Sequence, residues 1–331
     1  MPEENEETIA GESLALDAFA LRGRALENEP MAKHVSWRAG GAAAHAYAPA
    51  DLSDLAEFLR ELPPDEPVTF VGLGSNLLVR DGGYRGTVVL THDTHGTMRL
   101  DGDFVFAEAG VASPKVARFA ATHGFEGAEF LAGVPGTIGG ALAMNAGCYG
   151  SETWEFVVRV DTIDRGGRVH ARQPSDFETG YRHVRLRRGR IGEDEWFVGG
   201  WFRFRAGDGA HARTRINELL ARRIATQPLK LPNAGSVFRN PPGDHAARLI
   251  EACGLKGHSI GGARISEQHA NFIVNPGGAA RAADIEALIE VARATVRERF
   301  GIDLLPEVRI IGEAVVAAQS AAPSAPNGGE T

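Results

Sequence analysis

Residues 132–150 read AGVPGTIGGALAMNAGCYG and hold six glycines, with Thr137 and Asn145 among them. A tight turn needs one or two glycines, so six indicate a backbone laid along an extended ligand, such as a dinucleotide with its pyrophosphate. The alternative is a glycine-rich junction between a loop and a helix in a close-packed core. On the first interpretation, the cofactor-binding residues here are Gly133, Pro135, Gly136, Thr137, Gly139, Gly140, Asn145 and Gly147.

A second glycine-rich stretch, VGLGSNLL at 71–78, directly follows a run typical of a short buried strand. Its two glycines let the backbone approach a ligand, and successive backbone N–H groups can form a nest for an anion. The spacing is neither GxGxxG nor a Walker loop. The stretch is either an ordinary strand-to-turn connection or a phosphate site, whose residues would be Gly72, Leu73, Gly74, Ser75, Asn76 and Leu77.

A third stretch, NAGSVFRNP at 233–241, places the hydroxyl of Ser236 directly after Gly235 and near a cation and an amide. Ser236 is a candidate nucleophile or proton donor. No GxSxG elbow surrounds it, so hydrolase chemistry has little support. On local sequence alone, a serine that hydrogen-bonds within a turn is the favoured interpretation.

Composition excludes several classes of protein. Glycine makes up 41 of the 331 residues, about 12% against a typical roughly 7%, but without the G-X-Y period of collagen. The 43% of hydrophobic residues can fill a core, so the body is not disordered. The net charge of -8 comes from the two ends and leaves 31–312 neutral, which argues against a nucleic-acid or anionic-membrane partner.

The cysteines and the apolar runs indicate a cytoplasmic protein. Cys148 and Cys253 form neither a CxxC pair nor a cluster of metal ligands, so we expect no metal and no disulfide scaffold. The N-terminus is acidic and lacks the pattern of a signal peptide. No apolar stretch approaches the ~18 residues of a membrane-spanning helix.

Periodicity predicts a mixed α+β fold with a boundary near 206–210. Asp51 is the expected N-cap of a helix that ends at Leu62, and Ser113 is expected to cap a helix that ends at Gly124. Further helices are expected at 211–226, 246–253 and 283–300. Strands are expected at 68–71, 87–90, 159–163, 169–171, 196–204 and 307–311.

Taken together, the three stretches resemble one family, the UDP-N-acetylenolpyruvoylglucosamine reductases, which are flavin enzymes of peptidoglycan precursor synthesis. Other segments between about 34 and 312 match this family in order. They are HVSWRAGG at 34–41, GYR at 180–182, QP at 227–228, LIE at 249–251, GLKG at 254–257, SEQHANFIVN at 266–275 and PEVR at 306–309.

The resemblance implies a bipartite FAD-binding region of the vanillyl-alcohol-oxidase superfamily at 21–206, followed by a substrate-binding domain at 207–313. Composition adds a flexible acidic arm at 1–20 and a disordered tail at 314–331, which is rich in Ala, Ser, Pro and Gly. The implied cofactor is FAD, the co-substrate NADPH and the substrate the enolpyruvyl ether of UDP-GlcNAc. We expect a monomer of the family's shorter subtype.

The resemblance also assigns catalytic roles: Ser236 is the proton donor, Glu307 flanks the developing charge and Arg182 binds the substrate carboxylate. Reducing an enolpyruvyl bond needs a hydride on one carbon and a proton on the other, and fixed cations or acids must meet the charge that develops. Glu307 helps only if it is protonated or paired with a cation. Local sequence alone favours a solvated Arg182 in an arginine run at 182–190 and a surface Glu307 at a strand end.

One departure affects the expected role of Arg182. The family usually continues its Tyr-Arg motif with a serine and a phenylalanine, whereas this chain continues with HVRL at 183–186. The local support of the arginine is therefore expected to differ.

Two other functions fit parts of the sequence. Another FAD-dependent oxidoreductase of the same superfamily, such as an alcohol oxidase, would share the glycine-rich stretches. A binding module for RNA or phosphopeptides would rest on the arginine run at 182–190. The neutral body and the lack of aromatic residues among these arginines argue against that module.

Overall fold

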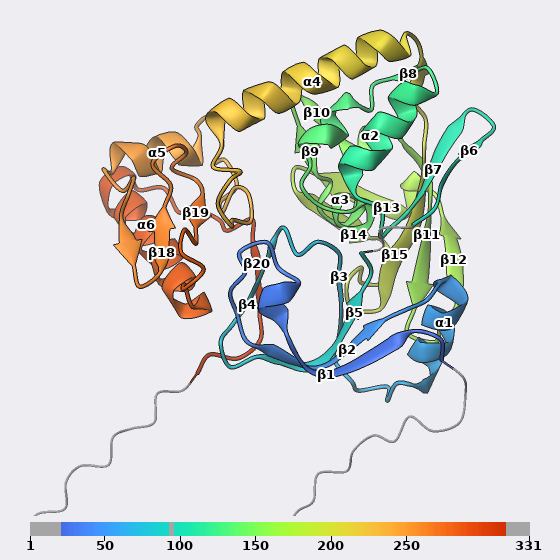
Figure 1. The fold of residues 1–331 in the computed structure, drawn as a ribbon, viewed down its shortest axis with the longest axis horizontal. Helices are drawn as coiled ribbons and strands as arrows, with labels where there is room; N and C mark the ends of the chain where they lie inside the picture. Colours follow the sequence, from blue (N-terminus) through green and yellow to red (C-terminus); the bar gives the residue numbers. More distant parts are fainter. Residues whose placement is uncertain (1–20, 93–95, 316–331) are drawn as a thin grey trace, which may run out of the picture.

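A computed structural model describes residues 21–92 and 96–315. The predicted arm at 1–20 lies outside the described residues, as does most of the predicted tail. The described chain forms two larger sheets, each with its own helices, and a smaller C-terminal unit of helices and short strands (Figure 1). The long helix α4 (Gly209–Thr226) runs along one side of the molecule, from the second sheet to the C-terminal unit.

The first sheet has four strands in the order β1-β2-β5-β3. Its strands are β1 (Arg24–Pro30), β2 (Ala42–Ala48), β5 (Tyr84–Leu90) and β3 (Val68–Val71). Only β1 and β2 are antiparallel, because α1 (Leu52–Glu61) carries the chain over from β2 to β3. The apolar face of α1 packs with Tyr47, Val89 and Trp196 in a shared core.

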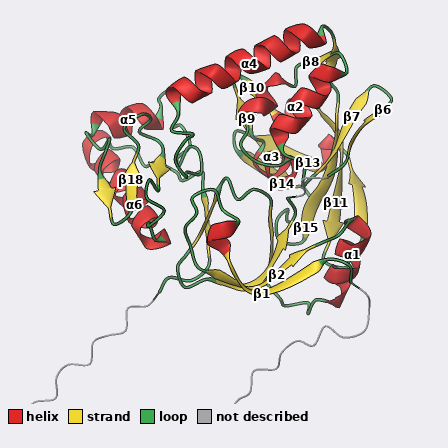
Figure 2. Cartoon of the chain, in the orientation of Figure 1, coloured by secondary structure: helices red, strands yellow, loops and turns green. Residues whose placement is uncertain are grey.

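The second sheet has five antiparallel strands in the order β12-β11-β15-β7-β6. They are β12 (Val169–Arg172), β11 (Val157–Asp164), β15 (Glu195–Phe202), β7 (Phe104–Glu108) and β6 (Met98–Asp101). In Figure 2, α2 (Ser113–Thr122), α3 (Ile138–Met144) and α4 lie together beside this sheet. Their apolar side chains and those of the sheet form the largest buried cluster.

Short strands and 3₁₀ helices connect these parts. The strand pairs are β9 (Gly147–Cys148) with β10 (Ser151–Glu152), β13 (Phe177–Gly180) with β14 (His183–Leu186), and β8 (Phe125–Glu126) with β16 (Arg205–Ala206). The 3₁₀ helices are Met31–Lys33, Glu129–Gly133, Thr153–Glu155 and Pro174–Asp176.

The C-terminal unit packs α5 (Ala246–Ala252) and α6 (Ala282–Phe300) against β17 (Ser259–Ile260), β18 (Ala263–Ile265) and β19 (Ile273–Val274). Several hydrogen bonds join this unit to the first part of the chain, among them those from Arg80 to Glu286 and those from the start of α6 to Asp81. The buried Trp37 donates its Nε1–H to the carbonyl of Ile273 at 2.7 Å, and Asn275 donates to the carbonyl of Trp37 at 3.0 Å.

After α6 the chain returns to the first part as β20 (Arg309–Ile311). This strand pairs in parallel with β4 (Leu77–Val79), which directly follows the first glycine-rich stretch. Figure 1 shows β20 and β4 side by side between the C-terminal unit and the first sheet. The pairing brings residues near 307 beside residues near 76, although about 230 positions of sequence separate them.

The structure confirms the predicted α+β class and most predicted elements. Asp51 caps α1 by accepting a hydrogen bond from the backbone N–H of Asp54 at 2.9 Å, as expected. The predicted cap at Ser113 is wrong. Ala112 is the N-cap of α2, because the helix begins one residue earlier than predicted and turns the Ser113 side chain into the core. The fully buried Ser113 hydroxyl has no hydrogen-bond partner among residues 21–92 and 96–315.

Candidate active site

A cavity of about 440 Å³ lies where the three parts of the chain meet. Both glycine-rich stretches line it, and so do the three predicted catalytic residues, Arg182, Ser236 and Glu307. These groups are scattered over more than 230 positions of sequence. Of the predicted cofactor-binding residues, the cavity is lined by Gly72, Leu73, Gly74, Ser75, Asn76, Leu77, Gly133, Pro135, Gly136, Thr137, Gly139, Gly140 and Gly147.

The first glycine-rich stretch connects β3 to β4 through a turn that only glycine fits. Gly74 has φ +56°, and a Cβ there would clash with the carbonyl oxygen of His34. Its own carbonyl accepts a hydrogen bond from the backbone N–H of Ser36 at 3.2 Å. The turn is therefore held from outside while its other side faces the cavity.

The second glycine-rich stretch lies directly against the first. A Cβ on Gly72 would clash with the Thr137 side chain, and one on Gly136 would lie 3.1 Å from the Ser75 hydroxyl oxygen. By contrast, a Cβ on Gly140 would meet no protein atom within 4 Å, although Gly140 lines the cavity. Gly72 and Gly136 thus let the two stretches pack closely into one wall of the cavity, and Gly140 leaves the space beside α3 open.

Asn145 is the predicted cofactor residue that does not line the cavity. It ends α3 in the left-handed conformation, with φ +43°, and is 3% exposed. Its side chain donates to the carboxylate of Glu152 and accepts from the backbone N–H of Trp154. It therefore stands behind the cavity wall.

Trp196 provides a test of whether the cavity suits a large aromatic cofactor. The indole lines the cavity and is 4% exposed, and it stacks on Phe70 with 4.8 Å between the ring centroids. Its Nε1–H is buried without a hydrogen-bond partner among the described residues. An orphaned donor at a glycine-walled cavity matches a ligand that carries its own acceptors, as FAD does.

Ser236 is held at the cavity by its neighbours. Asn271 accepts the backbone N–H of Val237 through its carbonyl and that of Phe238 through its side chain, both at 2.9 Å, and donates to the Phe238 carbonyl at 2.8 Å. No hydrogen bond of the Ser236 hydroxyl is found within the described chain, so its proton is available to a ligand.

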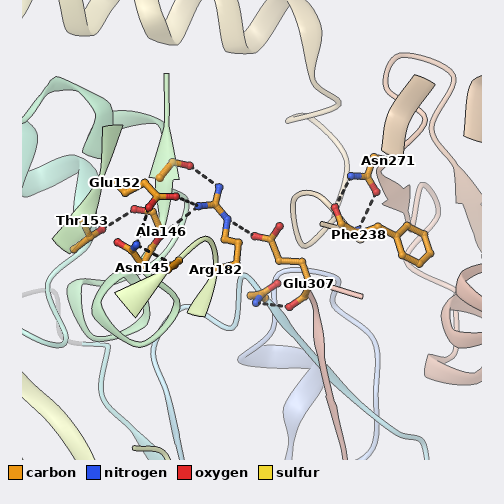
Figure 3. A network of polar contacts seen from close by, with 11 residues as sticks. Asn145, Ala146, Glu152, Thr153, Arg182, Phe238, Asn271 and Glu307 are labelled. Carbon is orange, nitrogen blue, oxygen red and sulfur yellow. Dashed lines mark hydrogen bonds and ion pairs between the residues drawn. The ribbon is translucent and has the colours of Figure 1, made fainter. Parts of the chain in front are cut away.

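Arg182 and Glu307 form an ion pair in the cavity wall, with 2.9 Å between Nε and Oε1 (Figure 3). Their side chains are only 15% and 17% exposed. Burial raises the pKa of Glu307, against the opposing effect of Arg182 and Arg239. The pair supplies the cation that Glu307 needs if it is to flank a developing negative charge.

The backbone of Glu307 connects the serine loop to the first glycine-rich stretch. The Glu307 N–H donates to the carbonyl of Val237 at 2.7 Å, and its carbonyl accepts from the side chain of Asn76 at 3.1 Å. The predicted proton donor and the predicted charge-flanking residue are therefore fixed relative to each other. The site holds a fixed hydroxyl, a cation and a paired acid around one space.

Several residues that line the cavity are absent from the set predicted by sequence. They are Tyr181, Trp196, Arg223, Gln227, Asn271 and Arg309. Arg223 donates to the side-chain oxygen of Gln227 at 2.8 Å, and burial lowers its pKa. Arg223 lies in a basic segment at the end of a helix, ARRIATQ at 221–227, where an arginine is normally solvated. The local sequence therefore does not predict that Arg223 is buried.

Within 21–92 and 96–315, no group of three or more His, Cys, Asp or Glu residues has the arrangement of a metal site. No helix in the same ranges is both long and apolar enough to cross a membrane.

Comparisons with known proteins bear on both halves of the chain. Residues 43–171 match the FAD binding domain family, and residues 227–311 match the family described as UDP-N-acetylenolpyruvoylglucosamine reductase, C-terminal domain. These matches confirm an FAD-binding region that precedes a different C-terminal domain. The boundary predicted at 206/207 falls between the two matches and stays a prediction.

The similar proteins cover nearly the whole chain. The UDP-N-acetylenolpyruvoylglucosamine reductase of Thiobacillus denitrificans is 60% identical over 310 residues, which are 89% of this chain and 94% of that protein. The reductase of the same name from Methylococcus capsulatus is 57% identical over 304 residues, 92% of this chain and 98% of its own. The crystal structure of UDP-N-acetylenolpyruvylglucosamine reductase (MurB) from Thermus caldophilus matches with a TM-score of 0.73 at 31% identity, covering 87% of this chain and 98% of that one.

Proposed function

Because the chain belongs to the UDP-N-acetylenolpyruvoylglucosamine reductase family and is thus an FAD-binding oxidoreductase, we propose that it uses NADPH to reduce the enolpyruvyl ether of UDP-GlcNAc to UDP-N-acetylmuramate. One observation carries this proposal. The Ser236 hydroxyl, the Arg182 guanidinium and the Glu307 carboxylate line the same cavity as both glycine-rich stretches.

FAD, when bound, supplies the hydride that reaches the terminal carbon of the enolpyruvyl group. The two glycine-rich stretches would hold the cofactor with their backbone and short side chains. The residues are Gly72, Leu73, Gly74, Ser75, Asn76 and Leu77 in the first stretch, and Gly133, Pro135, Gly136, Thr137, Gly139, Gly140 and Gly147 in the second. The orphaned N–H of Trp196 gives it a further donor.

Arg182 binds the substrate carboxylate, into which negative charge moves as the hydride arrives. Its fixed positive charge acts in a wall that is mostly buried, where electrostatic stabilisation is stronger than in water. Glu307 keeps the guanidinium at this wall by accepting a hydrogen bond from the Nε–H of Arg182. The raised pKa of Glu307 favours its neutral form as a second carboxylate approaches.

Ser236 donates its hydroxyl proton to the carbon next to the carboxylate, which is carbanionic after hydride addition. Serine is a weak acid near pH 7, but a carbanion is a strong base, so a positioned hydroxyl suffices. The alkoxide that remains takes a proton back before the next turnover. The clamp that Asn271 forms around Val237 and Phe238 keeps this hydroxyl in place.

The assay that tests the proposal follows the flavin. Purified protein is reduced with NADPH without oxygen, and the enolpyruvyl ether of UDP-GlcNAc is then added. We expect the 450 nm absorbance of oxidised flavin to return in proportion to the substrate, with UDP-N-acetylmuramate as product. Reoxidation by oxygen alone, with no response to this substrate, would instead favour an oxidase of the same superfamily.

The remaining features of the proposal concern the state of the protein. It acts as a monomer of the shorter subtype, in the cytoplasm, on a small-molecule substrate and without a nucleic-acid partner. Sedimentation of the FAD-loaded protein at micromolar concentration should give one species near 35.3 kDa. A dimer under these conditions would contradict the monomer.

A further inference from the structure

Arg182 is held in an unusual place for an arginine. It lies on the turn between β13 and β14 with φ +53°, a left-handed conformation that residues other than glycine, asparagine and aspartate rarely adopt. The segment that follows, HVRL at 183–186, lacks the serine and the phenylalanine of the usual family pattern. Something other than the turn itself must keep the guanidinium at the cavity wall.

The side of the guanidinium away from Glu307 faces a second carboxylate, that of Glu152. The distance between Arg182 Nη1 and Glu152 Oε1 is 3.7 Å. Two backbone carbonyls complete this side: Nη1 donates to that of Asn145 at 3.3 Å and Nη2 to that of Gly147 at 2.8 Å. Figure 3 shows the guanidinium between the carboxylates of Glu152 and Glu307.

Asn145 joins this carboxylate to the turn that carries Arg182. Its side-chain N–H₂ group donates to Glu152 Oε2 at 2.7 Å and to the Gly180 carbonyl at 3.1 Å. One buried amide thus fixes the direction of the Glu152 carboxylate and the end of β13 together. The left-handed conformation of Asn145, at the end of α3, aims its side chain at both.

Most N–H donors of Arg182 are already used within the protein. Of the five N–H groups of Arg182, one binds Glu307, two bind carbonyls and one points towards Glu152. One N–H on Nη2 is left to meet a substrate carboxylate. A single free donor is useful only when the guanidinium cannot rotate, so its orientation must be fixed from behind.

From this arrangement we propose that Glu152, oriented by Asn145, is a positioning residue that anchors the Arg182 guanidinium for the substrate carboxylate. The inference rests on the proposed role of Arg182. Glu152 touches neither the cavity nor Glu307 and acts through Arg182 alone. A substrate carboxylate and the Glu307 carboxylate would compete for the Arg182 guanidinium. The contact with Glu152 then keeps the guanidinium from moving towards either of these two carboxylates.

The test variant is Glu152→Gln, because glutamine can still accept the hydrogen bond of Asn145 while it loses the charge that faces Arg182. We expect FAD content, the flavin spectrum and the rate of flavin reduction by NADPH to stay unchanged. We expect kcat/KM for the enolpyruvyl substrate to fall about tenfold, since a small displacement of a positioning group is costly. Titration of the oxidised enzyme with substrate, followed by flavin absorbance, should show a similar rise in Kd.

Glu155→Gln is the matched control. Glu152 and Glu155 cap the 3₁₀ helix at 153–155 reciprocally, and Glu155 is exposed and makes no described contact with Arg182. If Glu152 mattered only through this cap, both variants would lose the same activity. Equal losses would therefore overturn the inference, as would an unchanged kcat/KM in Glu152→Gln.

A double-mutant cycle separates this inference from the proposed function. In an Arg182→Ala background, Glu152→Gln should have no further effect on single-turnover flavin reoxidation, because it acts through the missing guanidinium. Equal effects in both backgrounds would overturn the inference alone. A normal rate in Arg182→Ala itself would overturn the proposed role of Arg182.

Discussion

A carboxylate such as Glu307 can serve a site of hydride transfer only if its own charge is controlled. The chain does this with Arg182, which lies 125 positions away in sequence and 2.9 Å away in space. Neither residue is identifiable as buried from its neighbours, since one follows a loop and the other opens an arginine run. Each makes the burial of the other tolerable, because a lone buried charge is costly.

The first residue-scale prediction concerns Ser236→Ala. We expect normal flavin reduction by NADPH and a loss of roughly 10²-fold or more in substrate reduction, because only the proton donor is removed. Stopped-flow absorbance measures the two half-reactions separately. Ser259→Ala, in an exposed strand of the C-terminal unit, should leave both rates unchanged. Near-normal turnover of Ser236→Ala would remove this serine as the donor.

The second residue-scale prediction concerns how Glu307 makes the stability of the protein depend on pH. Since burial raises the pKa of Glu307 in the folded state above the ordinary 4.5, the folded protein binds more protons than the unfolded chain over the interval between these two pKa values. The contribution of Glu307 to the free energy of unfolding is thus greatest below pH 4.5 and is lost as pH rises through the folded-state pKa.

Urea denaturation of the wild type and Glu307→Gln at several pH values between 4.5 and 7.5 checks this sign. The difference in unfolding free energy, wild type minus variant, should fall as pH rises. Glu178→Gln is the control, because Arg185 lowers the pKa of Glu178 and moves its titration below this range. A difference that rises with pH for Glu307 would contradict the raised pKa, because it would mean that the attraction of Arg182 outweighs burial.

At the scale of single elements, α3 shows how a helix can also serve as a ligand surface. Gly140 lines the cavity, and a Cβ there would meet no protein atom within 4 Å. Since Gly to Ala inside a helix normally adds roughly 0.5–1 kcal/mol of stability, this glycine is unfavourable for the helix alone. Its presence is explained by the cofactor that we place against it.

The prediction for Gly140→Ala follows from this conflict. The cofactor-free variant should be as stable as the wild type or slightly more so, whereas its affinity for FAD should fall about tenfold, since the methyl group occupies cofactor space. Thermal denaturation and fluorescence titration with FAD measure the two effects. Gly277→Ala, whose Cβ also meets no atom within 4 Å but lies outside the cavity, should bind FAD normally. Unchanged affinity in Gly140→Ala would remove α3 from the cofactor site.

On the scale of the whole molecule, the return of the chain as β20 closes the site. This short strand pairs with β4, and Glu313 then makes backbone hydrogen bonds with Gly82 and Gly83. The predicted role of Glu307 thus depends on a pairing between two strands that lie on either side of the C-terminal unit in the sequence. The end of the described chain thus returns to β4 and to residues 82–83 and completes the cavity.

Truncation tests this dependence. A protein that lacks 2–10 and 316–331 should bind FAD and turn over normally, because the described residues 21–315 already supply the contacts of β20 and Glu313 that close the site. A protein that ends at Val308 lacks β20 and should lose substrate reduction and much of its FAD. Flavin content after gel filtration checks both. Loss of FAD in the first protein would contradict the prediction that both ends are dispensable.

Sequence alone determined the kinds of elements, their approximate bounds and the chemistry of the motifs, because periodicity, caps and glycine clusters act over a few residues. The tertiary structure decided which of these motifs meet. It moved Asn145 behind the wall, turned Ser113 into the core and supplied Arg182 with Glu152 and Glu307 as partners. Such contacts depend on how distant strands pair and on what each side chain displaces from water, and no local pattern encodes either.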